Sequence, residues 1–483
     1  MRVVSSGRNR WLIFGSLVVA AAVLASCGIV LYGRYFPSKT AVSSSPSGVG
    51  AESSGSVHTA PALSSALSSI WANPLKNVSG EYTIAEVTTY QAETFYPDNL
   101  RDTSSPQNSY LPAGTVDYCG ANDILATVNG EQKQYRLLRY GKMVYVQNPS
   151  SGTNIKVYKG SLPSANHVSI ASVKEDSRFT TITLNTDWKA PFTLELAPQS
   201  YVGPGTAANA PNFGVTDVTY DQVQIQFCYA SSGSGKMGFA ADSVLSGGSW
   251  SDQKDGYTLT LKLRQTGKFY GWNASYDSNG HLIFTFLKPV QTAAADNTYG
   301  WSLKGATVML DPGHGGSDIG APGSDPKYPE SVLNLALAKV MRTELQSIGA
   351  NVLMTRTADT RITLNTVVRT TKAAKPDIFV SVHHNASVST SLNGYANYYY
   401  TPFSKALGNY VNLSAKDLYK INEGCNYYPY YVTRLSDCPA ILTENGYMSN
   451  PDQYAWIVKT STIQKQAKAN VQGIVNYFKS IKR

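Results

Sequence analysis

The sequence of 483 residues has few charged side chains and few cysteines. Only 15% of the residues are Asp, Glu, Lys or Arg, and the formal net charge of +9 is a modest excess over the whole length. The basic residues do not form the compact cluster that is typical of a nucleic-acid-binding protein. A modest basic excess suits a polyanionic neighbour, such as a bacterial wall or a membrane surface. No Cys-x-x-Cys pair occurs, so a structural zinc ribbon is not indicated.

One apolar run lies near the N-terminus. Residues 11–33 contain no charged side chain and are long enough to cross a bilayer as a helix. Three arginines precede this run. The positive-inside rule therefore predicts a cytoplasmic tail at residues 1–10, a transmembrane helix or signal anchor at 11–33, and an extracytoplasmic remainder. Two alternatives stay open, namely a lipoprotein processed at Cys27 and a cleaved signal peptide.

Four cysteines remain when Cys27 is set aside, and an even number permits pairing in an oxidising compartment. Cys425 and Cys438 bracket a short tyrosine-rich segment. We expect these two cysteines to form a disulfide when the protein is exported, and two buried thiols are the alternative.

The rest of the chain divides into three regions by composition. Residues 34–76 are rich in Ser, Ala and Gly, which predicts a disordered tether. Residues 77–298 contain short runs rich in Tyr, Val, Ile and Thr, interrupted by Gly, Pro, Asn or Asp, which predicts an all-β region. We expect a small β module at 77–148 and a β-sandwich-like module at 149–298. In residues 302–483 strands alternate with helical periodicity, which predicts an α/β domain with a mixed sheet flanked by helices.

The β region contains no catalytic constellation. His167 and His281 are isolated, so we expect a non-catalytic module that binds or positions, with a simple spacer as the alternative. Its clearest predicted hairpin combines the alternating run Tyr257–Leu263 with the turn Asp277–Gly280 and the strand that follows that turn.

Two histidine positions follow predicted strands in the C-terminal domain. The apolar run Thr307–Leu310 predicts a buried strand, and His314 lies just beyond it among glycines that let a ligand approach. The apolar strand at 378–382 ends at His383 and His384. The ends of strands in open α/β sheets are where ligands bind. Taken alone, His314 is also compatible with a histidine that merely caps a loop.

Two glutamates complete the candidate site. Glu330 begins an amphipathic helix predicted at 330–348, and Glu444 follows the strand predicted at 440–443. Two imidazoles and one carboxylate are the ligand set of a catalytic zinc site that keeps a fourth position for water. The remaining carboxylate is then a candidate base that takes a proton from this water as the water attacks a carbonyl group. The pattern predicts a zinc-dependent amide hydrolase outside the membrane.

The same segments resemble the zinc-dependent N-acetylmuramoyl-L-alanine amidases of the Amidase_3 family, over residues 306–479. The resemblance is carried by Glu330 and by the three sequences DPGHGG, SVHHNA and PAILTENGYMSN, which contain His314, His383 and Glu444. It implies that Zn²⁺ is held by His314, Glu330 and His383, and that Glu444 is the catalytic glutamate. His384 lies outside the implied ligand set. Neighbouring side chains of a strand also point to opposite faces, so both histidines should not reach one ion.

The implied reaction is hydrolysis of the amide between N-acetylmuramic acid and the L-alanine of the stem peptide in peptidoglycan. Two other interpretations remain open. One is a zinc peptidase that cuts within the stem peptide, and the other is a wall-binding protein with an inactive hydrolase-like domain. The expected location is the cell membrane, with the catalytic domain on the wall side and the β region in contact with the wall or a regulatory protein.

Overall fold

The computed structural model describes residues 82–95, 106–128, 131–148, 152–198, 220–253 and 256–481. No helix within these ranges is long and apolar enough to cross a membrane. The membrane-spanning helix expected at 11–33 and the tether expected at 34–76 lie outside the described residues, so both stay predictions.

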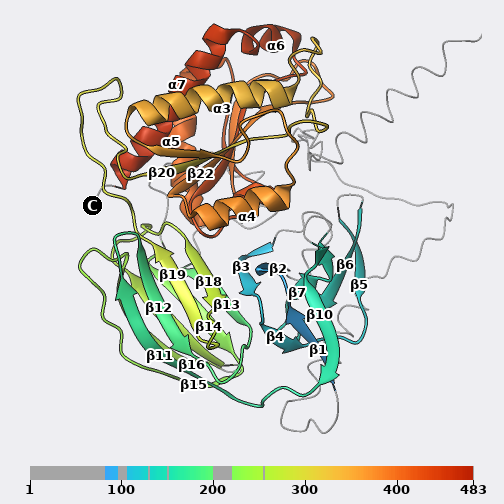
Figure 1. The fold of residues 1–483 in the computed structure, drawn as a ribbon, viewed down its shortest axis with the longest axis vertical. Coiled ribbons are helices and arrows are strands. Elements are labelled where there is room, and N and C mark those ends of the chain that lie inside the picture. The colour runs from blue at the N-terminus through green and yellow to red at the C-terminus, as the bar shows by residue number, and fades with distance from the viewer. Residues whose placement is uncertain are drawn as a thin grey trace, which may run out of the picture. The chain divides into compact units, whose positions relative to one another are not determined.

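Two small sheets form the first β module (Figure 1). Its strands are β1 (Tyr82–Val87), β2 (Gln91–Phe95), β3 (Pro106–Pro112), β4 (Val116–Tyr118), β5 (Ile124–Val128), β6 (Glu131–Leu137), β7 (Met143–Tyr145), β8 (Gln147–Asn148), β9 (Gly152–Thr153) and β10 (Ile155–Gly160). The strand orders are β10–β1–β4 and β3–β2–β7–β6–β5, and β8 pairs with β9. Val87, Leu111 and Val144 contribute to one small apolar core that both sheets share.

Strand β10 pairs with β1 of the first module, whereas the sequence analysis assigned residues 149–298 to the second module. The pairing with β1 is antiparallel and runs from Ile155 opposite Val87 to Gly160 opposite Tyr82. We therefore propose that the first β module ends after Gly160.

The second β module is a sandwich of two sheets. Its strands are β11 (Asn166–Glu175), β12 (Phe179–Asn185), β13 (Phe192–Ala197), β14 (Gln222–Cys228), β15 (Ala230–Ser234), β16 (Leu245–Gln253), β17 (Gly256–Leu263), β18 (Trp272–Tyr276) and β19 (Leu282–Leu287). One sheet has the order β15–β11–β12–β19–β18 and the other β13–β14–β17–β16. The ring of Phe192 on β13 meets the ring of Phe284 on β19 edge to face, with 5.0 Å between centroids. Aromatic side chains from both sheets thus fill the space between them.

The last hairpin differs from the predicted one. Asp277–Gly280 does form a turn, in which Gly280 N donates to Asp277 O at 3.1 Å, but this turn joins β18 to β19. Strand β17, which contains the run Tyr257–Leu263, lies in the other sheet between β14 and β16. An alternation of apolar and polar residues indicates a strand with one buried face, but it does not indicate which strand pairs with it. The sequence prediction therefore missed β18, which directly precedes the turn and pairs with β19.

The C-terminal domain has a six-stranded mixed sheet, as predicted for an α/β domain. Its strands are β20 (Thr307–Pro312), β21 (Asn351–Met354), β22 (Ile378–Asn385), β23 (Tyr395–Tyr399), β24 (Asn422–Tyr427) and β25 (Ala440–Tyr447). Its helices are α3 (Glu330–Ser347), α4 (Leu364–Ala374), α5 (Lys405–Ala415), α6 (Pro451–Ile457) and α7 (Thr460–Ser480), with 3₁₀ helices η4 (Pro402–Ser404), η5 (Lys416–Leu418) and η6 (Tyr431–Arg434). The strand order is β21–β20–β22–β25–β23–β24, and only the β23–β25 pair is antiparallel. Helices α3, α5 and α7 lie on one side of the sheet and α4 on the other (Figure 1).

Two elements of this domain differ from the sequence prediction. Residues 430–433, expected to form a strand, lie largely in η6, and the edge strand β24 was not expected at all. The sequence of β24, NEGCNY, is polar because an edge strand with partly exposed side chains needs no apolar run.

The predicted disulfide between Cys425 and Cys438 is wrong, because no disulfide joins these two buried residues. Cys425 lies on β24, opposite Asn397 of β23, and β23 separates β24 from β25. Neighbouring strands of a sheet lie about 4.8 Å apart, so β24 lies about 10 Å from β25. Cys438 comes shortly before β25 in the chain. A disulfide requires Cα atoms within about 7 Å. The chain between the two cysteines instead connects the edge strand β24 to β25, with β23 lying between these two strands.

The β modules contact residues 428–439, which connect β24 to β25 and which we call the lead segment. Trp272 N donates to Ser436 O at 2.6 Å, and the Asn273 amide donates to the Asp437 carboxylate. Glu93 of β2 pairs with Arg434 at 3.2 Å. Both β modules therefore hold the part of the chain that runs into β25.

Replacement of Trp272 by alanine tests this packing. The Trp272 side chain is only 2% exposed and stacks on Tyr110 of the first module with 4.6 Å between ring centroids. We expect Trp272→Ala to lower the free energy of unfolding by about 3–5 kcal/mol, because it leaves a large cavity in a buried aromatic stack. Equilibrium urea denaturation measures this loss. Leu125→Ala, at an exposed leucine, is the control and should change the free energy by less than about 0.5 kcal/mol.

Candidate active site

The loop after β20 holds His314 in an unusual backbone conformation. Its φ is 63°, in the left-handed region, and it lies between Gly313 and Gly315. The Nδ1 atom of His314 pairs with Asp318 Oδ1 at 2.9 Å. This contact fixes the ring so that Nε2 faces Glu330 Oε1 at 3.3 Å.

Glu330 is the first residue of α3, and its side chain is 1% exposed. Its Oε2 accepts a hydrogen bond from Ala321 N at 2.9 Å, and its Oε1 accepts one from the Asn334 amide at 3.1 Å. Burial raises the pKa of this carboxyl, but the nearby imidazoles of His314 and His383 outweigh burial and hold its pKa well below the usual range. The two imidazoles therefore favour the charged form of Glu330.

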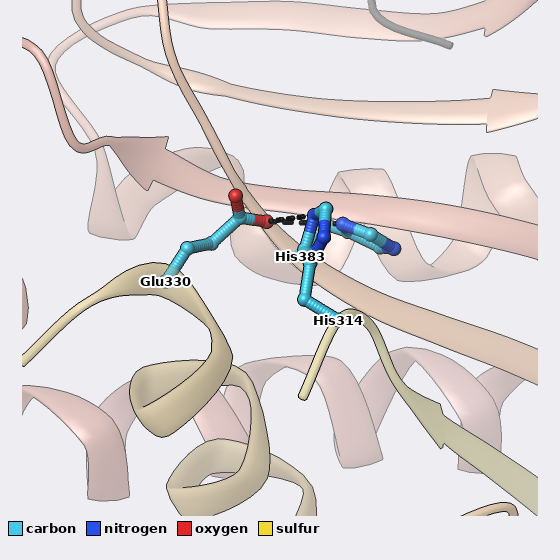
Figure 2. Close-up of side chains that lie close together, drawn as sticks. All are labelled: His314, Glu330 and His383. Atoms are coloured by element: carbon cyan, nitrogen blue, oxygen red, sulfur yellow. Dashed lines mark hydrogen bonds and ion pairs between the residues drawn. The ribbon is translucent and has the colours of Figure 1, made fainter. Parts of the chain in front are cut away.

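His383 lies on β22 and completes a three-residue cluster (Figure 2). Its Nδ1 is 3.0 Å from Glu330 Oε1, and its ring centroid lies 5.0 Å from that of His314. Figure 2 shows the Glu330 carboxylate directed at both rings. A Cβ atom at Gly313 would collide with the His383 ring, so only glycine permits this close approach.

The donor set fits a zinc ion. One ligand atom from each of His314, Glu330 and His383 lies within 4.8 Å of the other two. Zinc bonds of about 2.1 Å in a tetrahedron place ligand atoms about 3.4 Å apart, which is close to the two contacts that Glu330 Oε1 makes with the imidazoles. The bond from His314 to Asp318 is also typical, since a metal-binding histidine usually donates its other N–H to a carboxylate or a carbonyl oxygen.

Two further side chains hold the three candidate ligands in place. The buried guanidinium of Arg356 donates to Pro312 O, Gly313 O and Ser331 O at 2.8–2.9 Å, which ties the histidine loop to the start of α3. The Asn334 amide donates to Gly313 O at 3.2 Å as well as to Glu330. Arg356 and Asn334 thus position the ligands from outside the cluster.

His384 belongs to this network but not to the cluster. It is buried, and its Nδ1 pairs with Asn334 Oδ1 at 2.8 Å. Burial lowers the pKa of His384 to about 4, so this imidazole is neutral at physiological pH. The structure brings His314, Glu330 and His383 together and leaves His384 outside the group that could share one ion.

Glu444 lies beside the cluster on the neighbouring strand. In the parallel pairing of β22 with β25, it is the register partner of His383. Its side chain is buried, and Glu444 Oε2 has no hydrogen-bond partner among the described residues. Burial, followed by the negative charge of Glu330, raises the pKa of Glu444 well above its usual value. A raised pKa makes the Glu444 carboxylate a stronger base.

Sequence reasoning missed two acidic residues of the site. Asp318 supports His314, and its position four residues later in a loop carried no recognisable signal. Glu423 on β24 accepts a hydrogen bond from Tyr447 OH at 2.8 Å and raises the pKa of Glu444 further. Its strand was itself not predicted, so nothing in the sequence placed Glu423 near Glu444.

The C-terminal domain is similar to known proteins. A family model described as N-acetylmuramoyl-L-alanine amidase, Amidase_3, matches residues 308–476. A probable cell wall amidase LytH from Staphylococcus epidermidis is 34% identical over 212 residues, which are 44% of this chain and 68% of that protein. The LytH of Staphylococcus aureus is 35% identical over 213 residues, covering 43% and 67% of the two chains.

Solved amidase structures match the same domain. The catalytic domain of the amidase CwlV from Bacillus (Paenibacillus) polymyxa var. colistinus has 32% identity and a TM-score of 0.35, and the match covers 36% of this chain and 98% of that one. An N-acetylmuramoyl-L-alanine amidase from Clostridium difficile 630 has 30% identity, a TM-score of 0.35, and coverages of 36% and 97%. The sequence identity to relatives that are covered over two thirds of their length decides the assignment. This chain belongs to the Amidase_3 family of N-acetylmuramoyl-L-alanine amidases.

Proposed function

We propose that residues 302–483 hydrolyse the amide between N-acetylmuramic acid and L-alanine in peptidoglycan, with Zn²⁺ held by His314, Glu330 and His383. The observation that carries this proposal is the convergence of two imidazoles and a charged carboxylate next to the buried Glu444. The family membership of the chain supports the same substrate and the same bond. Zinc suits this set of nitrogen and oxygen donors, because catalytic zinc sites take three such ligands and leave one position open.

Glu444 is the proposed base and acid of the reaction. A bound zinc ion supplies Lewis acidity, which activates water and polarises the amide carbonyl. Glu444 accepts a proton from the water as the water oxygen bonds to the carbonyl carbon. It then returns this proton to the nitrogen of L-alanine when the C–N bond breaks. The surroundings that raise the pKa of Glu444 suit this exchange, because a base must hold the proton between the two steps.

We also propose an extracytoplasmic location, with residues 11–33 as the membrane anchor. The substrate lies outside the cytoplasmic membrane, and the run at 11–33 is long enough to span it. In this arrangement the β region lies between anchor and catalytic domain along the chain, where it has access to the wall.

Removal of metal tests the cofactor. We expect treatment with a chelator to abolish release of L-alanine amino termini from purified peptidoglycan, because the proposed zinc ligands form the one cluster of this kind found among the described residues. Addition of one equivalent of Zn²⁺ should restore activity. Mg²⁺ should not, since it prefers an octahedral set of oxygen ligands. Full activity in the chelated protein would contradict a metal-dependent reaction.

Glu444→Gln tests the base. The amide has nearly the same shape but cannot accept the proton, so we expect kcat to fall by about 10²- to 10⁴-fold. Zinc content, measured by atomic absorption, should stay at one per chain because Glu444 is not a proposed ligand. Near-native turnover would remove Glu444 from this role.

Alanine substitutions of His383 and of His384 test which of these neighbouring residues is a zinc ligand. His383→Ala should lose zinc, whereas His384→Ala should retain it. Because His384→Ala leaves the buried Asn334 Oδ1 without its imidazole partner, we expect a loss of about 1–3 kcal/mol in the free energy of unfolding. Metal content and urea denaturation are measured on both variants. Equal loss of zinc from the two would reverse the assignment.

A further inference from the structure

A cavity of about 270 Å³ lies between the first β module and the catalytic domain. Tyr90, Gln91 and Tyr145 line it from the module. Helix α4 contributes Arg369 and Lys372, and the lead segment contributes residues 431 and 434–436. None of the four residues of the amidase site is among those that line it. The cavity is therefore separate from the amidase site, and its walls come from the first β module and the catalytic domain.

Positive charge exceeds negative charge in the wall of the cavity. Arg434 is paired with Glu93 at 3.2 Å, and Lys372 is paired with Asp437. Arg369 is exposed, and no ion pair or hydrogen bond of its guanidinium is found with the residues that the structure describes. A guanidinium offers a planar pair of donors that matches a carboxylate in a bidentate manner. The surplus charge thus suits an anionic ligand.

A buried side-chain amide in the wall of the cavity needs a hydrogen-bond acceptor. Gln91 lines the cavity, and its Nε2 atom is buried without a hydrogen-bond partner among the described residues. A buried donor without an acceptor is unfavourable, so a carbonyl or hydroxyl oxygen of a ligand would satisfy it. Tyr90 and Tyr145 supply rings that combine an apolar face with a hydroxyl group. Together these groups match a short peptide end that carries a carboxylate and a neighbouring carbonyl oxygen.

We propose that this cavity binds the carboxylate-bearing end of a peptidoglycan stem peptide, as a binding site separate from the amidase site. The volume lies just below the usual range for ligand pockets, about 300–1,000 Å³, so the cavity fits a peptide end rather than a folded partner or a long polymer. This inference rests on the proposed function, since a wall amidase meets many stem peptides close to the one that it cuts. Binding one stem peptide in the cavity would hold the enzyme on the glycan network while another enters the site.

The test uses the full chain carrying Glu444→Gln, which binds without turnover. It is titrated calorimetrically with a purified stem tetrapeptide that has a free C-terminal carboxylate. The additional substitution Arg369→Ala should weaken binding by about tenfold, because it removes the guanidinium that would pair with the ligand carboxylate. Gln91→Glu should weaken binding as well, because it places a carboxylate opposite the ligand. The matched control is Arg342→Ala on α3, which removes the same charge from an element that does not line the cavity.

Two further probes identify the chemistry. The same tetrapeptide with a C-terminal amide should bind equally weakly to the protein that retains Arg369 and to the Arg369→Ala variant. Poly(glycerol phosphate) should not compete. Arg369-dependent binding of that polymer without binding of the peptide would overturn the proposal, as would equal affinities of Arg369→Ala and Arg342→Ala for the peptide.

Cleavage assays separate this inference from the proposed function. Without the Glu444 substitution, Arg369→Ala should raise KM for polymeric peptidoglycan about tenfold and leave kcat and zinc content unchanged. If the unmodified chain releases no L-alanine amino termini, the proposed function fails. If it does release them and Arg369→Ala has an unchanged KM, the separate binding site alone is refuted.

Discussion

The candidate site depends on one contact, in which a buried carboxylate oxygen of Glu330 meets two imidazole rings. A carboxylate so far from water is unfavourable unless charged groups and hydrogen bonds compensate. Here the compensation comes from the loop after β20, from β22 and from α3 itself. Glu330 therefore links these three elements to one another. Arg356 strengthens this dependence, because its guanidinium joins the carbonyl groups of the loop to that of Ser331 in α3.

Two carboxyl groups lie in this site, and their surroundings push their pKa values apart. Both Glu330 and Glu444 are buried, which alone would raise both pKa values. Oxygen Oε1 of Glu330 contacts two imidazole rings, whereas Glu444 has an oxygen without a hydrogen-bond partner among the described residues and is close to the charges of Glu330 and Glu423. One carboxyl is thus kept ionised and suited to a cation, and the other is kept ready for a proton. Such a separation is how a single site assigns different roles to similar groups.

The candidate site was predictable from the sequence because its residues follow local signals. His314, His383 and Glu444 come at or near the ends of apolar strands, and parallel strands bring such ends to one edge of a sheet. The parts that failed depend on pairing across the sheet. Strand β24 has no apolar run, so the sequence did not predict this strand or its position beside β23. The distance between Cys425 and Cys438, which prevents a disulfide, follows from that position and was therefore not predicted either. Likewise, alternation identified β17 and β19 as strands but did not say that they lie in different sheets.

The structure also bears on whether the β region is only a spacer. The lead segment runs directly into β25, the strand of Glu444, and the β modules satisfy its polar groups: Trp272 N donates to Ser436 O, and Glu93 pairs with Arg434. A spacer requires no such contacts. In addition, Phe269 of the second module packs edge to face on Phe403, with 5.4 Å between centroids, inside a core that runs from the sandwich into the catalytic domain. Since removal of the β region would expose this core and leave Arg434 without its carboxylate, the β region is part of the structure that orients the strand of the proposed base.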